Sequence, residues 1–210
     1  MRYLLLSTPI LALTALAPVA HAQAPQAAPP AQAVPQPAAP AVESAAPTTA
    51  ATKPLDTLFE ALKRERDPEK AKGIASQVIA EMNDSGSATV NLLMQWSEDA
   101  IKEKKNAAAL DFLDRITLLD PAFTEGWNRR ATLHYTMGDQ RKAMADIAEV
   151  LKREPRHFGA LAGLAGILTE VGDDDMALKA WERYLNIYPA DREAQEAVSK
   201  LSEKIAGNRT

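Results

Sequence analysis

From Leu55 onward, apolar residues recur three and four positions apart, and no stretch alternates between apolar and polar residues. This spacing predicts α-helices with one buried face and gives no indication of β-strands. Turn signals such as Gly138-Asp139 and Gly172-Asp173 divide the pattern into segments of about a dozen residues. Pairs of such short helices bury too little surface alone, so we expect each hairpin to stack on its neighbours.

The helical pattern repeats at a fixed interval. Pro121, Pro155 and Pro189 are 34 residues apart, and so are Gly138 and Gly172. The same step separates a third set of positions, Ala109, Ala143 and Ala177. A fixed period of this length indicates one helix–turn–helix unit that is copied and stacked, and it makes binding a better hypothesis than catalysis.

These residues resemble the tetratricopeptide (TPR) repeat, in which Gly-Asp marks the turn, Ala lies in the second helix and Pro closes the unit. The best match covers about 124–157, and similar repeats cover about 90–123 and 158–191. A degenerate hairpin is expected at about 52–85. The chain departs from the family pattern in the best-matched repeat, where Arg130 replaces a leucine and His134 replaces a tyrosine. It also departs at the family's small glycine position, which is Ser97, Ala131 and Ala165 in the three repeats.

The resemblance implies an all-α fold, a right-handed superhelical solenoid of three to four TPR hairpins within residues 55–206. A C-terminal capping helix is predicted at 191–206, because Asp191 is a good N-cap and Ala194, Val198, Leu201 and Ile205 form one apolar stripe. The aromatic residues Trp96, Trp127, Trp181 and Tyr184 are predicted to lie in the core. The glycines of one helix, Gly159, Gly163 and Gly166, are expected to form a close-packing surface.

The N-terminal quarter of the chain has a different composition. Residues 1–22 have the pattern of a secretory signal peptide, with cleavage expected after Ala22 or Ala24, so we expect export, most simply to a periplasm. An uncleaved signal is the alternative and the one expected route to a membrane. Residues 23–54 are rich in Ala and Pro and contain no apolar residue larger than valine, which predicts a disordered linker.

The composition excludes several kinds of site. The chain has no cysteine, so disulfides and thiolate metal sites are excluded. Its formal net charge of −4 argues against nucleic acid and anionic lipid as partners. His134 and His157 lack metal-ligand spacing, and Asp173-Asp174-Asp175 precedes a predicted helix, where N-capping explains it. We therefore expect no metal, no cofactor and no small-molecule substrate.

In TPR proteins the first helices of successive hairpins line a concave groove that binds peptides, and the resemblance carries these positions over. In the first matched repeat they are Met94, Glu98, Ile101 and Lys102. In the second they are Glu125, Asn128, Thr132, Tyr135 and Thr136. In the third they are Ala162, Gly166, Thr169 and Glu170. The family's clamp for chaperone carboxylates is not matched, because its positions are Met94, Glu98, Arg129, Gly159 and Gly163.

The leading hypothesis is a non-enzymatic scaffold or adaptor in the cell envelope that binds a protein or peptide segment in this groove. The alternative is a periplasmic assembly factor or chaperone-like holder of exported client proteins. An enzyme would need two carboxylates within reach of one another, for which Glu98 and Glu125 are the candidates. A structural homo-oligomer also stays open, because the exposed ends of a solenoid can stack.

Overall fold

The computed structural model describes residues 54–207, and every regular element among them is an α-helix. The predicted signal peptide and most of the predicted linker lie outside the described residues. The helices are α1 (Pro54–Arg64), α2 (Pro68–Asn83), α3 (Ala88–Lys102), α4 (Asn106–Leu119), α5 (Thr124–Thr136), α6 (Gln140–Arg153), α7 (Phe158–Glu170), α8 (Asp174–Leu185) and α9 (Arg192–Gly207).

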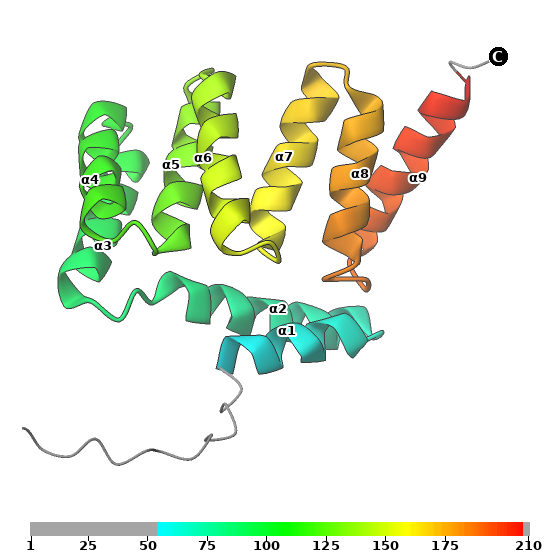
Figure 1. Cartoon of the computed structure of the whole chain (residues 1–210), viewed down its shortest axis with the longest axis horizontal. Helices are drawn as coiled ribbons and strands as arrows, with labels where there is room; N and C mark the ends of the chain where they lie inside the picture. The colour runs from blue at the N-terminus through cyan, green and yellow to red at the C-terminus, as the bar shows by residue number, and fades with distance from the viewer. Residues whose placement is uncertain (1–53, 208–210) are drawn as a thin grey trace, which may run out of the picture. The chain divides into compact units, whose positions relative to one another are not determined.

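Six of these helices form three antiparallel hairpins, α3–α4, α5–α6 and α7–α8, which stand side by side (Figure 1). The second helix of each hairpin packs on the first helix of the next, and α8 packs on α9 in the same way. Fully buried residues such as Leu113, Ile116, Val150 and Leu161 fill the space between them. The predicted all-α stack of hairpins is confirmed.

The turns inside the hairpins explain the spacing of the glycines. Gly138 and Gly172 adopt left-handed backbone conformations with φ of 81° and 82°. The equivalent residue of the first hairpin, 34 positions before Gly138, is Lys104, which has φ of 59°. This conformation costs a residue with a Cβ atom about 1–2 kcal/mol, so the α3–α4 turn is strained where the other two are not.

The expected hairpin at 52–85 is present as α1 and α2, but it does not stack on α3–α4 as a preceding repeat would. Figure 1 shows α1 and α2 crossing the ends of the upright helices. Phe59, Leu62 and Val78 share one apolar core with Phe158 and Tyr188, which come from the last repeat. The hairpin therefore braces distant repeats instead of extending the stack.

The segment between α2 and α3 explains this change of direction. It includes Gly86, with φ of 71°, and a polar cluster that holds the turn. Asn91 Nδ2 donates to Asp84 Oδ1 at 2.9 Å, and the Ser85 amide donates to Asn91 Oδ1 at 3.0 Å. Because these bonds fix the chain as it enters α3, α2 leaves the stack instead of continuing it.

The expectation that four aromatic residues lie in the core is wrong for Trp96, which is 46% exposed. Trp127 is half-buried between the guanidinium groups of Arg130 and Arg153, each 4.8 Å from its ring centre. Tyr184 is buried, and Trp181 packs against it at the edge of the core.

No helix among residues 54–207 combines the length and apolar character needed to cross a membrane.

Candidate functional site

A hollow of about 250 Å³ opens between α5 and α7, with α6 contributing to its floor. It contains five of the residues predicted for the groove, Asn128, Thr132, Tyr135, Ala162 and Gly166. The rest of its lining is Ala131, Ile147, Gly159, Ala160, Gly163 and Ile167. The structure thus brings together groove positions from two repeats around one mostly apolar space.

The hollow exists because α7 carries glycine where other helices carry side chains. A Cβ atom built on Gly166 has no neighbour within 4 Å, and one built on Gly163 meets only Ile147 Cδ1, at 3.6 Å. The expectation that these two glycines form a close-packing surface is therefore wrong. They leave a space that a ligand side chain can fill.

The other predicted groove residues lie elsewhere. Thr169 lines a neighbouring hollow of about 510 Å³ between α7, α8 and α9, which shares Gly166 with the first. Glu98 lies in a third hollow beside Arg129, at the α3 end. Met94 also lines that hollow but is only 6% exposed. Ile101 packs against the apolar core that contains Met94, so neither residue offers much surface to a ligand.

Sequence reasoning missed two features of these hollows. Ile147 belongs to a second helix of a repeat, which the resemblance does not assign to the groove. Lys200 and Lys204 come from α9 and line the neighbouring hollow. The helical pattern of α9 contained the signal for both lysines, but only the docking of α9 against α8 shows that they reach this surface.

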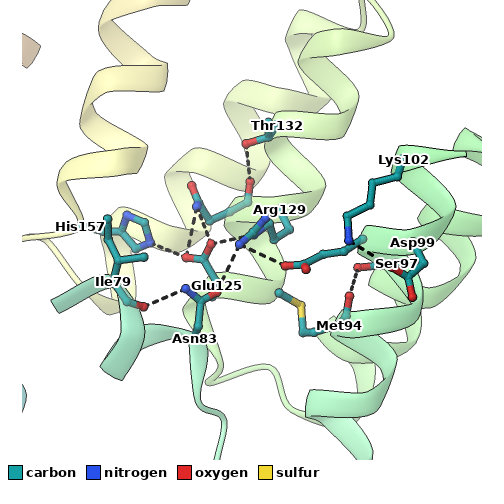
Figure 2. Close-up of polar contacts among 12 residues, drawn as sticks. Ile79, Asn83, Met94, Ser97, Asp99, Lys102, Glu125, Arg129, Thr132 and His157 are labelled. Atoms are coloured by element: carbon teal, nitrogen blue, oxygen red, sulfur yellow. Dashed lines mark hydrogen bonds and ion pairs between the residues drawn. The ribbon is translucent and has the colours of Figure 1, made fainter. Parts of the chain in front are cut away.

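A buried carboxylate beside the hollow organises its polar side. Glu125, which is 6% exposed, receives hydrogen bonds from Asn128 Nδ2 at 3.1 Å, Arg129 Nε at 3.0 Å and His157 Nε2 at 3.0 Å (Figure 2). Arg129 also donates to Asn83 Oδ1 of α2 at 3.3 Å. This network joins the bracing hairpin to α5 and to the start of α7.

The protonation state of His157 follows from its partners. The Ala160 amide donates to His157 Nδ1 at 3.1 Å, which caps α7, so Nδ1 carries no proton and Nε2 donates to Glu125. Burial alone raises the pKa of Glu125. The hydrogen bonds from His157 and Asn128 and the positive charge of Arg129 outweigh it and hold that pKa below its usual value of 4.5.

The same contacts occupy the only carboxylate pair proposed for catalysis. Arg129 lies between the two acids, with Nη2 3.3 Å from Glu98 Oε1 and Nε 3.0 Å from Glu125 Oε1. Two carboxylates bound to one guanidinium are poorly suited to exchange protons with a substrate.

Among residues 54–207, no group of three or more His, Asp or Glu side chains is placed to hold a metal ion.

The departures from the family pattern in the second repeat form an ion-pair cluster. Arg130 donates to both oxygens of Asp146, at 2.9 and 2.7 Å, and to Asp114 of the preceding repeat at 2.7 Å. Asp146 is 5% exposed, and His134 Nε2 lies 3.9 Å from it. His134 therefore lies beside this buried ion-pair cluster.

The rim between the α5–α7 hollow and the neighbouring hollow beside α9 is also polar. The hydroxyl of Tyr135 donates to Glu170 Oε1, and Gln140 Nε2 donates to Glu170 Oε2 at 2.9 Å. The hydrogen bond to Glu170 raises the pKa of the Tyr135 hydroxyl. Glu170 thus gives this edge of the groove an acidic character, and Tyr135 is held in place beside the hollow.

No protein-family model matches the chain. Two solved structures show a similar fold. The first TPR of Spaghetti (RPAP3), bound to the HSP90 peptide SRMEEVD, is 20% identical over 57% of this chain and 95% of that one, with a TM-score of 0.53. The Sgt2 TPR domain from Aspergillus fumigatus is 19% identical over 59% and 84%, with a TM-score of 0.53. At these identities the likeness shows the fold alone.

A curated relative is much more similar in sequence. A TPR repeat-containing protein of Rhizobium etli is 64% identical over 156 residues, which is 74% of this chain and 76% of that protein. The resemblance drawn from the 34-residue period is confirmed by this match and by the two structures. The chain belongs to the TPR repeat-containing proteins.

Proposed function

We propose that the protein is a non-enzymatic adaptor of the cell envelope that binds a segment of a partner protein in the hollow between α5 and α7. The observation that carries this proposal is the open space over Gly166, in a hollow lined by groove positions of two adjacent repeats. Its apolar floor suits one apolar or aromatic side chain, and Asn128 and Thr132 at its wall suit the backbone of that segment.

The structural neighbours support a peptide ligand, since one was solved with an HSP90 peptide and another, the TPR2B domain of yeast Sti1, in a complex with Hsp70. The chemistry of the ligand differs here. The clamp positions hold Glu98 and Gly163 among others, and Glu170 lies at the rim. An acidic C-terminal peptide is therefore disfavoured, and we propose an internal segment with an apolar anchor residue.

The location is part of the proposal. The pattern of residues 1–22 supports export to a periplasm. A protein without cysteine is held by its core alone, which suits an envelope compartment of any redox state.

The test uses a variant that fills the hollow. Gly166→Leu places a side chain in open space, so the helix tolerates it while the ligand site is lost. Gly73→Leu is the matched control, because Gly73 is also a helical glycine with no atom within 4 Å of a built Cβ, and it lies on α2 outside the hollow.

Tagged wild type and both variants are expressed in their own envelope, crosslinked and purified. We expect one stoichiometric partner with wild type and Gly73→Leu that is absent with Gly166→Leu. A broad set of unrelated exported proteins lost together would favour the chaperone-like alternative. Recovery of the same partner with all three proteins would refute the groove as the binding surface.

A further inference from the structure

Large apolar side chains are exposed at the α3–α4 end of the stack. Four of the nine large hydrophobic residues that the structure shows as exposed lie on these two helices: Leu92, Trp96, Leu118 and Leu119. Trp96 of α3 also contacts Phe112 of α4, with ring centres 5.7 Å apart. Leu92, Trp96, Phe112 and Leu119 define the surface that we call the end face.

The repeat period shows what the end face is built to contact. Thirty-four residues after Leu92, Trp96 and Leu119 are Gly126, Arg130 and Arg153. A Cβ on Gly126 would lie 2.5 Å from Ile116, Arg130 bonds Asp114, and Arg153 Nε donates to the Pro121 carbonyl at 2.6 Å. All three positions contact the preceding hairpin. On α3–α4 the equivalent positions stay exposed, because the apolar residues of the preceding hairpin, α1–α2, share a core with the last repeat instead.

The opposite end of the stack cannot supply the missing cover. The exposed side chains of α9 between 192 and 204 are all polar or charged: Arg192, Glu193, Gln195, Glu196, Ser199, Lys200, Ser202, Glu203 and Lys204. An apolar surface gains nothing from contact with such a face, so head-to-tail stacking of copies is disfavoured. Residues 23–53 of the same chain are also unsuited, because their largest apolar residue is valine.

The charged residues beside the end face can pair with the same residues of a second copy. Asp111 and Arg115 are exposed, one helical turn apart on α4, and both lie on the same side of Phe112. Within residues 54–207, neither side chain is engaged in an ion pair. When two copies meet about a twofold axis with their α4 helices antiparallel, Asp111 of each lies opposite Arg115 of the other, which forms two identical pairs around the apolar centre.

We infer that the end face is a homodimer interface, in which two copies of this chain pair through α3 and α4 about a twofold axis. The apolar centre supplies the attraction, and the two Asp111–Arg115 pairs fix the antiparallel orientation. Because both end faces are used, the assembly closes as a dimer and leaves the α5–α7 hollows of both copies free.

Sedimentation velocity on the purified full-length protein, from micromolar to millimolar, tests the inference. We expect wild type to reach twice the chain mass and Trp96→Glu to stay monomeric. Leu119→Glu, at a residue 61% exposed, is a second variant with the same expected result if Trp96→Glu fails to fold by circular dichroism. Val171→Glu, at a residue 60% exposed in the α7–α8 turn, is the control and should dimerise like wild type.

Charge variants test the orientation. Arg115→Asp or Asp111→Arg alone should raise the dimer dissociation constant about tenfold or more, because like charges then face each other. A mixture of the two variants should form a heterodimer with near wild-type affinity. Arg183→Asp, the same change at the equivalent position of the last repeat, should have no effect.

Three results would overturn the inference. They are a wild-type monomer at every concentration, a dimer insensitive to Trp96→Glu and Leu119→Glu, and charge variants whose mixture does not associate. If the end face instead binds a different protein, wild type is a monomer alone, so this outcome also counts against the homodimer.

Discussion

Replacing Gly166 with alanine should stabilise the protein, although glycine lies there in the middle of a repeat. Alanine is favoured over glycine in a helix interior by about 0.5–1 kcal/mol. The new Cβ meets no atom within 4 Å, so no packing cost offsets this gain. We therefore expect the free energy of unfolding to rise by about 0.5–1 kcal/mol, and Gly73→Ala on α2 to give a similar gain.

Replacing Gly126 with alanine should instead lower the free energy of unfolding. Its Cβ would lie 2.5 Å from Cγ2 of Ile116, which is fully buried and has no free space to move into. Overpacking of this kind costs about 1–3 kcal/mol, and the helix-propensity gain is small so close to the start of α5. We expect a net loss of about 1–2 kcal/mol for Gly126→Ala.

Urea unfolding followed by circular dichroism measures all three variants against wild type. Opposite signs at Gly166 and Gly126 would support the view that the hollow is open space while the α4–α5 contact is tight. A loss of stability above about 1 kcal/mol for Gly166→Ala would mean that the hollow is filled by the protein itself and is not open space.

Four further predictions concern buried or strained polar groups. Lys104→Gly should raise stability by about 1 kcal/mol in thermal melts, because it removes the left-handed strain. Arg130→Leu should cost about 3 kcal/mol or more by leaving Asp146 buried without its partner, and adding Asp146→Leu should recover most of that loss in a double-mutant cycle. Tyr184→Phe should lower the free energy of unfolding in urea by about 1 kcal/mol, because the hydrogen bond from the Tyr184 hydroxyl to Asp191 is lost. Glu125→Gln should cost about 2 kcal/mol of stability at neutral pH. Because the pKa of Glu125 is lowered in the folded state, the ionised carboxylate stabilises the fold and the protonated one does not. Urea unfolding at a series of pH values should therefore show the stability difference from wild type shrinking as pH falls below about 4.5.

Each of these predictions has an outcome that contradicts it. The first two are an unchanged stability in Lys104→Gly and a double mutant Arg130→Leu/Asp146→Leu no more stable than Arg130→Leu alone. The other two are an unchanged stability in Tyr184→Phe and a stability difference between Glu125→Gln and wild type that stays constant with pH. The Glu125 result is the most informative of the four, because the same carboxylate holds Asn128 at the wall of the hollow.

The repeat itself was predictable because the 34-residue period is recorded directly in the residues that shape turns. Gly138 and Pro155 act through their own backbones, and local effects of this kind can be read from a sequence. The strained Lys104 turn was not predicted, because lysine does not signal a left-handed conformation and only the period places it opposite Gly138.

Long-range packing was beyond the sequence. The pattern of α1 and α2 shows that each has an apolar face, but not which surface that face will contact. The prediction that Trp96 is buried failed for the same reason, since its cover would be a preceding hairpin that packs elsewhere. In the candidate site, the resemblance located Asn128, Tyr135 and Gly166, whereas their shared hollow depends on the contact between α5 and α7.

Site-specific photocrosslinking in the envelope shows whether the α5–α7 hollow is the surface that contacts the partner. A photoreactive residue at Thr132, at the wall of the hollow, is compared with one at Lys152 on the exposed side of α6. We predict one dominant adduct from Thr132 that disappears in the Gly166→Leu background, and no matching adduct from Lys152. The same adduct from both positions, or an adduct from Thr132 that survives Gly166→Leu, would contradict the account.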